Sequence, residues 1–209
     1  MKNQACEIVI VLDRSGSMSS IKTDTEGGFN TFLAEQKAAP GEAFISLYQF
    51  DDVYETVYEG KKIADAPSLH LHPRGSTALF DAMGKTLATA LGRITDDKRK
   101  VIFLTMTDGG ENASREHTSK SVGDLINKAK ARGWQCLFIG ANQDAILAAA
   151  AFNIGAAGAL NMAANPVGTQ SLYQSLSANT KAYRSGASVN MNWSATDRDA
   201  QNKAMNKTA

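Results

Sequence analysis

The sequence EIVIVLDRSGSMSS at residues 7–20 joins an aliphatic run to a carboxylate and a cluster of hydroxyls. Residues 6–12 are almost continuously apolar and β-branched, which is typical of a strand covered on both faces of a sheet. Three interpretations fit the polar residues that follow. They form a turn that leaves a buried strand, the capped start of a helix, or a site that binds through oxygen atoms.

Strand and helix signals alternate along most of the chain, and two strands flank the pair Asp51-Asp52 at a spacing that predicts an antiparallel hairpin. The alternation predicts an α/β fold, with a doubly wound, mostly parallel sheet, one antiparallel edge strand and helices on both faces. After the first strand, we expect strands at 43–50, 53–59, 100–107, 134–141 and 158–164, and helices at 21–37, 77–94, 119–132, 143–152 and 166–184.

The composition changes near residue 184. Residues 1–184 are predicted to form one domain, whereas 185–209 are rich in Asn, Ser, Thr and Ala and contain few large apolar side chains. Such a segment buries too little surface to offset its chain entropy, so we expect a mobile tail. Trp193 is the candidate anchor within it.

Charge and hydropathy exclude several classes of protein. The formal net charge is +1, and the basic run DDKRK at 96–100 is short and mixed in sign, which argues against nucleic-acid binding. No stretch approaches the roughly 20 apolar residues of a membrane span, and the N-terminus does not match a secretory signal. We therefore expect a cytoplasmic protein in which Cys6 and Cys136, each inside an apolar run, are buried and reduced.

Two aspartates and a group of hydroxyls are predicted to meet at one edge of the sheet. Asp13 and Asp108 each end an aliphatic strand, and the carboxyl ends of parallel strands share an edge. Ser15 and Ser17 follow the first of them, and Thr77 precedes a helix that must start near the same edge. Capping by Ser76 and Thr77 is the simpler alternative for Thr77. Oxygen ligands suit a hard divalent cation, Mg²⁺ above all, with Mn²⁺ or Ca²⁺ as alternatives.

The charge balance of this site favours a further ligand. Two carboxylates supply at most two negative charges against the two of the cation, and less where they act through water. The cation then still attracts a carboxylate from outside, which is what a docking site requires.

These residues carry a resemblance to a known family. Asp13-Arg14-Ser15-Gly16-Ser17 resembles the Asp-x-Ser-x-Ser motif of von Willebrand factor A (vWA) domains, and Thr77 in GSTALFDA and Asp108 in TDGGEN resemble its later parts. Together they look like the family's metal-ion-dependent adhesion site (MIDAS), within a resemblance that covers roughly residues 5–184.

The resemblance implies a role for each residue. The hydroxyls of Ser15 and Ser17 would bind the cation directly, and Asp13 and Asp108 would act largely through water or hydrogen bonds. Thr77 would bind directly when a ligand is engaged, and a partner's Glu or Asp would take the last position. Small stand-alone domains of this type occur in bacteria and their viruses, where such relatives are often coupled to AAA-type ATPases or to stress and metal-resistance systems.

Other residues near the motifs are expected to be ordinary. Glu111 is interpreted as a solvated loop residue, with assistance to the metal at the same edge as the alternative. Arg14, Met18 and Arg74 are interpreted as exposed loop residues, with selection of a partner as the alternative. We expect His70 and His72 to alternate along an extended segment, without a metal, and assign His117 no role.

The predicted function is a non-enzymatic, metal-dependent protein-binding module, with no nucleic acid or membrane as partner. An extracellular adhesin is opposed by the missing signal peptide. The alternative from another class is a Mg²⁺-dependent phosphohydrolase of haloacid-dehalogenase-like type, which also ends its first strand with an aspartate. That class needs a second aspartate two residues later, where this chain has Ser15.

Overall fold

A six-stranded sheet forms the centre of the molecule in the computed structural model, which describes residues 4–141 and 144–206. The strand order is β3-β2-β1-β4-β5-β6, and all neighbours pair in parallel except β2 and β3. The predicted mostly parallel sheet with one antiparallel edge strand is therefore confirmed. The strands span Cys6–Asp13 (β1), Ala43–Phe50 (β2), Tyr54–Lys62 (β3), Lys100–Thr107 (β4), Gln135–Ala141 (β5) and Ala159–Met162 (β6).

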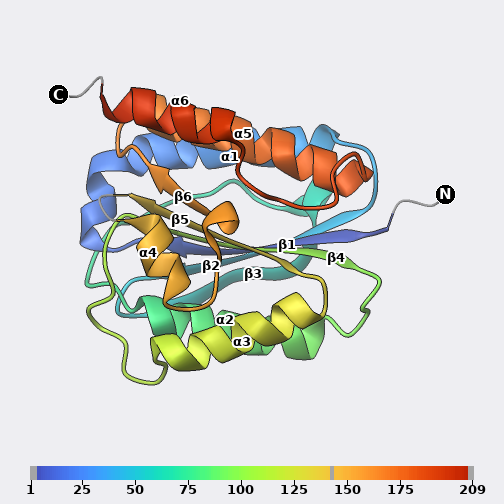
Figure 1. The fold of residues 1–209 in the computed structure, drawn as a ribbon, viewed down its shortest axis with the longest axis horizontal. Helices are drawn as coiled ribbons and strands as arrows, with labels where there is room; N and C mark the ends of the chain where they lie inside the picture. The colour runs from blue at the N-terminus through green and yellow to red at the C-terminus, as the bar shows by residue number, and fades with distance from the viewer. Residues whose placement is uncertain (1–3, 142–143, 207–209) are drawn as a thin grey trace.

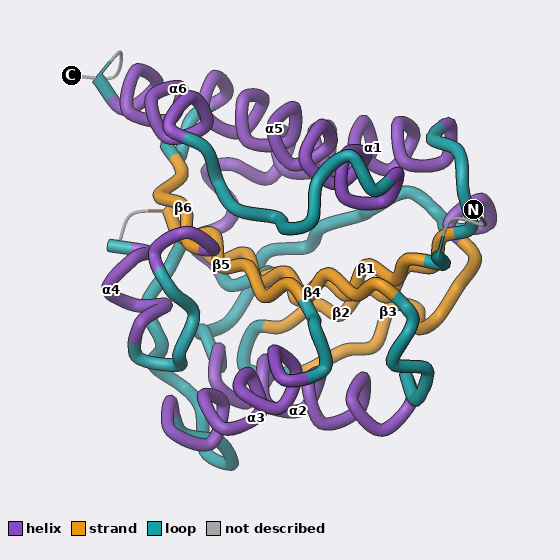
Figure 2. The backbone as a smooth tube through the Cα atoms, turned by 45° about the vertical axis from the view of Figure 1, so that its right-hand side comes forward, coloured by secondary structure: helices purple, strands orange, loops and turns teal. Residues whose placement is uncertain are grey.

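Helices cover both faces of the sheet, as expected for a doubly wound fold (Figure 1). Figure 2 shows α1, α5 and α6 on one side and α2 and α3 on the other. None of the helices formed by the described residues is both long and apolar enough to cross a bilayer. The α-helices span Lys22–Ala38 (α1), Leu79–Arg93 (α2), Ser119–Ala131 (α3), Ala145–Ala150 (α4), Pro166–Ser185 (α5) and Ala195–Met205 (α6), and the 3₁₀ turns span Gly16–Ile21 (η1), Ile63–Asp65 (η2) and Ala156–Gly158 (η3).

The central strand β1 explains the two-sided core. All eight of its residues are buried. Ile8 and Ile10 pack with α1 and α5, whereas Val9 and Val11 pack with α2, α3 and α4. Because side chains alternate between the faces of a strand, a strand covered on both sides is apolar along most of its length, as β1 is from Ile8 to Leu12. The continuous aliphatic run is therefore the signature of this central position.

The expected helix at 143–152 begins at residue 143, which lies outside the described residues. The described part of that helix, α4, covers 145–150. The first helix also differs, because the 3₁₀ turn η1 precedes α1. This turn contains Ser17, Ser19 and Ser20, so the serine cluster lies between the end of β1 and the first residue of α1.

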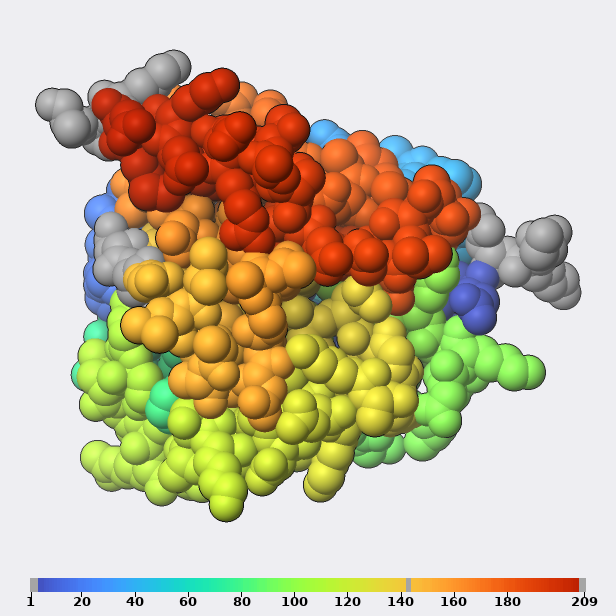
Figure 3. Space-filling model, in the orientation of Figure 1, coloured from blue at the N-terminus to red at the C-terminus, as the bar shows by residue number. Residues whose placement is uncertain are grey.

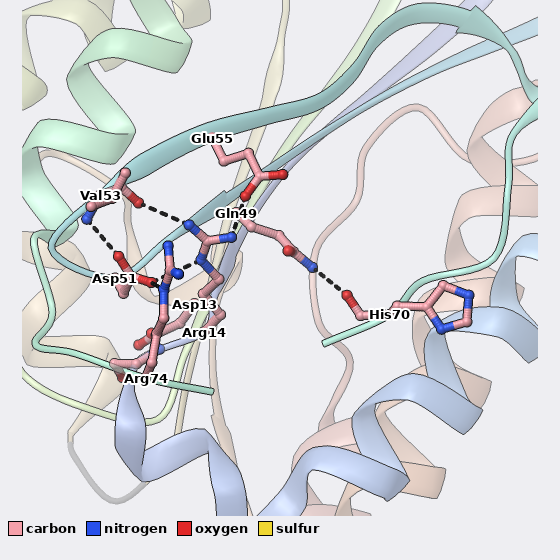
Figure 4. Close-up of polar contacts among 9 residues, drawn as sticks. Asp13, Arg14, Gln49, Asp51, Val53, Glu55, His70 and Arg74 are labelled. Atoms are coloured by element: carbon pink, nitrogen blue, oxygen red, sulfur yellow. Dashed lines mark hydrogen bonds and ion pairs between the residues drawn. The ribbon is translucent and has the colours of Figure 1, made fainter. Parts of the chain in front are cut away.

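Residues 66–78 contain no helix or strand and cross the molecule from the end of β3 to the start of α2. Side chains of the neighbouring elements hold this segment in place. Asn30 of α1 exchanges two hydrogen bonds with the backbone of Leu69, at 3.3 and 2.7 Å. Gln49 Nε2 of β2 donates to the carbonyl of His70 at 3.2 Å (Figure 4). The segment that ends at Thr77 is thus anchored along its length.

The C-terminal segment differs from the mobile tail that its composition predicts. It forms helix α6, and in Figure 3 its red atoms lie directly against the orange and yellow parts of the chain. Met191 and Trp193 are 1% and 5% exposed and belong to the core on the α1 side of the sheet. The backbone N–H and Nε1 of Trp193 donate to the carbonyls of Ala157 and Gly158. Burial of the Met191 and Trp193 side chains thus holds the segment against the core despite its polar average composition.

A local signal for α6 was present in the sequence. Ser194 is its N-cap, and the Asp197 side chain bonds back to the N–H of Ser194, which completes a capping box. The Ser-x-x-Asp spacing predicts a helix start even though the helix lacks an apolar stripe.

Candidate metal site

Asp13 is the last residue of β1 and ties that strand to β4. Its side chain is fully buried. Oδ1 accepts a hydrogen bond from the N–H of Ser15 at 2.6 Å, and Oδ2 accepts one from the Thr107 hydroxyl at 2.6 Å. Asp13 therefore fixes the turn that presents the serines, and it does so from below the surface. Thr107 was not singled out from the sequence, although it directly precedes Asp108.

The two serines and Asp108 form a chain of hydroxyl and carboxylate oxygens. Ser15 Oγ and Ser17 Oγ lie 3.1 Å apart, and Ser17 Oγ donates to Asp108 Oδ1 at 2.6 Å. Ser15 and Asp108 are 2% and 3% exposed, while Ser17 is exposed at the surface. The loops after β1 and β4 thus meet, as the parallel order of the strands predicts.

Thr77 comes from a third loop and lies at the same place. A Cβ atom added to Gly109 would lie 3.5 Å from Thr77 Oγ1 and 3.6 Å from Ser17 Oγ, so both hydroxyls flank this glycine. Asn112 holds the backbone of Thr77, since its Oδ1 accepts from the Thr77 N–H at 2.8 Å and its N–H donates to the Thr77 carbonyl at 3.0 Å. The structure therefore brings together all five predicted residues: Asp13, Ser15, Ser17, Thr77 and Asp108.

The simpler interpretation of Thr77 as a helix cap finds no support. Helix α2 begins at Leu79, with Ala78 as its N-cap and no side-chain cap bond at that position. The first N–H groups of α2 are instead bonded by the loop after β4, since Glu111 Oε2 accepts from Phe80 and Ser114 Oγ accepts from Asp81. Glu111 and Ser114 thus bond the start of α2, and the Thr77 hydroxyl stays at the candidate metal site.

The electrostatics of the site fit a cation. Asp108 Oδ2 is buried and has no hydrogen-bond partner among the described residues, and burial raises the pKa of Asp108. Burial also raises the pKa of Asp13 to about 6, against the hydrogen bonds from Thr107 and Ser15 that lower it. No ion pair among the described residues involves either carboxylate. A bound cation is the group that would stabilise both as anions.

The donor set is poor in carboxylates. The described part of the chain holds no cluster of three or more His, Cys, Asp and Glu side chains that could bind a metal. A cation at this site would rest on hydroxyl oxygens with two carboxylates behind them. That set suits a hard divalent ion and leaves its charge incompletely balanced.

Three other expectations for the neighbouring residues are wrong. Arg14 is buried and forms ion pairs with Asp51 and Glu55, and Met18 is fully buried, so neither is an exposed loop residue. Glu111 is half-buried and is more than a solvated loop residue, because its carboxylate accepts four hydrogen bonds from Phe80, Ala113 and Ser114. Met18 lies in the core, Arg14 pairs with residues of another segment, and Glu111 bonds to the start of α2; the local sequence pattern shows none of these contacts.

The remaining candidates lie as expected. Arg74 is exposed, and His70 and His72 are exposed with the buried Leu69 and Leu71 alternating between them. The missed residues are those that hold the three loops in place: Asp51, Asp81, Thr107 and Asn112. Asp81 accepts the backbone N–H groups of residues 115, 116 and 117, which fixes the far end of the loop after β4.

No family model matches this sequence, and no curated protein matches it. Solved structures do match. The vWA protein of Catenulispora acidiphila aligns at a TM-score of 0.57 and 19% identity over 85% of this chain and 43% of that one. The pilus adhesin SpaC of Lactobacillus rhamnosus GG aligns at 0.65 and 13% over 85% and 31%. The mussel byssus protein PTMP1, solved with zinc in its MIDAS motif, aligns at 0.49 and 18% over 68% and 37%.

This chain therefore spans less than half of each matched chain. The likeness to the first two shows the fold, and the chain is a vWA-like domain in that respect.

Proposed function

From this vWA-like fold, we propose that the protein is a metal-dependent protein-binding module. A divalent cation held at the candidate metal site would accept a Glu or Asp carboxylate from a partner protein. The observation that carries the proposal is the meeting of the Ser15, Ser17 and Thr77 hydroxyls around the buried carboxylate of Asp108, whose Oδ2 lacks a partner among the described residues.

Each residue has a role in this proposal. The hydroxyls of Ser15, Ser17 and Thr77 hold the cation, and Asp13 and Asp108 supply negative charge from behind them. When bound, the cation supplies a hard Lewis acid with an affinity for carboxylate oxygen. The chain's own contribution is to hold three loops rigidly so that the hydroxyls share one place. Mg²⁺ is the proposed ion in the cell, with Mn²⁺ and Ca²⁺ as alternatives.

We propose that the protein performs this binding function without catalysing a reaction. The phosphohydrolase alternative gains no support, because the residue two positions after Asp13 is Ser15. Its N–H group donates to Asp13, and its hydroxyl lies against Ser17 rather than serving as an acid. Turnover of para-nitrophenyl phosphate that needs Mg²⁺ and is abolished by Asp13→Asn would overturn this part.

The proposed partner is a protein with an exposed acidic residue, of the AAA-type ATPase class, in the cytoplasm of a bacterium or a phage-infected cell. The near-zero net charge agrees with a partner that is neither nucleic acid nor a membrane surface. The partner class rests on the resemblance of the motifs alone.

Calorimetric titration with Mg²⁺ and Mn²⁺ tests the metal site. Ser15→Ala, Ser17→Ala and Asp108→Ala should each lower the affinity by about tenfold or more, because each removes an oxygen of the site. Ser20→Ala is the matched control, since its exposed hydroxyl donates to the Ser17 carbonyl and lies outside the oxygen cluster. Equal affinity in all four variants would refute the assignment.

Partner binding is tested separately. A partner captured on the immobilised protein with Mg²⁺ should be released by chelator and should not bind Ser17→Ala. Replacing its acidic residue with the amide should abolish binding. Capture that survives both chelator and Ser17→Ala would contradict a cation-bridged contact.

A further inference from the structure

Asp51, in the turn between β2 and β3, contacts both of the loops that carry the hydroxyls. Its side chain is fully buried. Oδ2 accepts from Arg14 Nε at 2.9 Å and from Arg74 Nε at 2.8 Å, and Figure 4 shows the two guanidinium groups converging on this carboxylate. Oδ1 is also used, because it accepts from the N–H of Val53 at 2.5 Å. Oδ2 therefore binds the two neighbouring loops, and Oδ1 fixes the turn to which Asp51 itself belongs.

The two arginines stand next to the candidate ligands. Arg14 lies between Asp13 and Ser15 in sequence, and Arg74 lies three residues before Thr77. The main chain of Asp51 adds a third connection, since its carbonyl accepts from the N–H of Ala78 at 2.9 Å, directly after Thr77. Asp51 is thus bonded once to the loop that carries Ser15 and Ser17 (the serine loop) and twice to the loop that carries Thr77 (the Thr77 loop).

The two loops also touch each other at the place that Asp51 holds. The Arg74 N–H donates to the Arg14 carbonyl at 2.9 Å, and the Gly16 N–H donates to the Gly75 carbonyl at 3.2 Å. Gly75 has φ +65°, and a Cβ there would come within 1.9 Å of Asp52 Oδ1. The positive φ and the close approach both favour glycine at this position. A shift of one loop along the other would break both bonds and separate the hydroxyls.

The charges of this cluster balance. Arg14 also pairs with Glu55, so two guanidinium groups face two carboxylates. Burial alone would raise the pKa of Asp51, but the hydrogen bonds from Arg74 and Val53 and the charges of both arginines hold it below its usual value. The cluster therefore stays ionised at neutral pH and adds no net positive charge beside a site that would attract a cation.

We propose that Asp51 is the positioning residue of the candidate metal site, and that its pairs with Arg14 and Arg74 hold the serine loop and the Thr77 loop in register. The inference rests on the proposed function for its effect on metal binding. Its structural part, the coupling of the two loops, stands without any metal.

Arg74 offers the cleanest variant, because its side chain is 61% exposed and its loss should not unfold the protein. Arg74→Gln should lower Mg²⁺ affinity several-fold by calorimetry, while Arg74→Lys, which can still donate to Asp51, should stay near the wild type. Asp51→Asn should cost about tenfold or more, as expected for a residue that orients ligands without touching the ion. Arg115→Gln, at the same edge of the sheet, and Asp124→Asn, at an exposed position of α3, are controls with the same charge changes.

A second measurement separates this inference from the proposed function. In metal-free protein, Arg74→Gln should speed the hydrogen exchange of the Gly16 and Ala78 amides, and Arg74→Lys and Arg115→Gln should not. If the wild type binds no divalent cation, the proposed function fails, while faster exchange still supports the coupling. If the wild type binds Mg²⁺ and neither affinity nor exchange responds to Arg74→Gln and Asp51→Asn, the positioning role is refuted.

Discussion

The two edges of the sheet carry opposite hydrogen-bonding chemistry. At the carboxyl edge, side chains accept hydrogen bonds from the first N–H groups of helices. Glu111 does so for α2 at 2.9 Å, Asp144 for α4 at 3.1 Å and Asn165 for α5 at 2.8 Å. These acceptors satisfy groups that a helix start leaves unpaired and match the positive end of its dipole.

The amino edge does the reverse with donors. Arg184 donates to the Gln36 carbonyl near the end of α1 at 2.7 Å, and Lys100 donates to the Tyr183 carbonyl near the end of α5 at 2.6 Å. Arg132 donates to the Leu91 carbonyl near the end of α2 at 3.0 Å. Basic side chains favour these positions because helix C-termini carry partial negative charge and free carbonyls.

The difference teaches why a cation site belongs at one edge. Helices that follow parallel strands all start at the carboxyl edge, so carboxylates and hydroxyls gather there and keep lone pairs to spare. At the amino edge, helix carbonyls instead accept from guanidinium and ammonium groups, which cannot act as ligands of a cation. We therefore expect substitutions at the amino edge to change stability without changing metal affinity.

Trp193→Ala should destabilise the protein more than any other substitution considered at the amino edge. The indole is 5% exposed, packs in the core and donates to the Gly158 carbonyl just before β6. Its removal should lower the free energy of unfolding by about 3–5 kcal/mol, measured by urea denaturation. Val189→Ala, in the same segment and 85% exposed, is the control and should change little. Unchanged stability in Trp193→Ala would show that the C-terminal segment does not hold the core together.

Arg184→Met should have the next largest effect. Arg184 is 4% exposed and donates to Gln36 Oε1 and to the carbonyls of Gln36, Ala39 and Gly41, with no carboxylate partner among the described residues. Leaving the two buried Gln36 acceptors unpaired should cost roughly 2–3 kcal/mol. Lys181 lies on the same helix as Arg184 and forms an exposed ion pair with Glu35 of α1. Lys181→Met should therefore cost far less. Equal losses in the two variants would contradict a capping role for Arg184.

Asp81→Asn should give a smaller change, and one that depends on pH. Burial alone would raise the pKa of Asp81, but the N–H groups of Arg115, His117 and Glu116 hold it below its usual value. A carboxyl whose folded-state pKa is lowered stabilises the protein above its unfolded-state pKa, and this stabilisation is lost as pH falls through the folded-state pKa. The variant should lose about 1–2 kcal/mol at neutral pH and little as the medium becomes strongly acidic.

Chemical denaturation across this pH range measures the effect. The stability curve of Asp81→Asn should be flatter than that of the wild type below about pH 4. Asp124→Asn, an exposed aspartate on α3, should follow the wild-type curve. A parallel curve for Asp81→Asn would mean that the three backbone bonds contribute nothing at this edge.

Local sequence patterns were enough to predict the strands of the sheet and the positions of the two aspartates of the site. The aliphatic runs predict the strands because a strand covered on both faces of a parallel sheet is mostly apolar, as β1 is from Ile8 to Leu12. The positions of Asp13 and Asp108 follow, since both come at strand ends and parallel strands end at one edge. The spacing of the two strands around Asp51 also predicts the hairpin, whereas the role of the Asp51 side chain could not be predicted.

Only the tertiary structure decided what each polar residue contacts. Arg14 is buried because Asp51 lies beside it, Glu111 caps α2 from a different loop, and Trp193 reaches the core beside β6. The partners are 37, 31 and 35 positions away in the printed bonds. Contacts at such separations leave no periodic trace in the chain, because they depend on which elements the fold packs side by side rather than on the residues next in line.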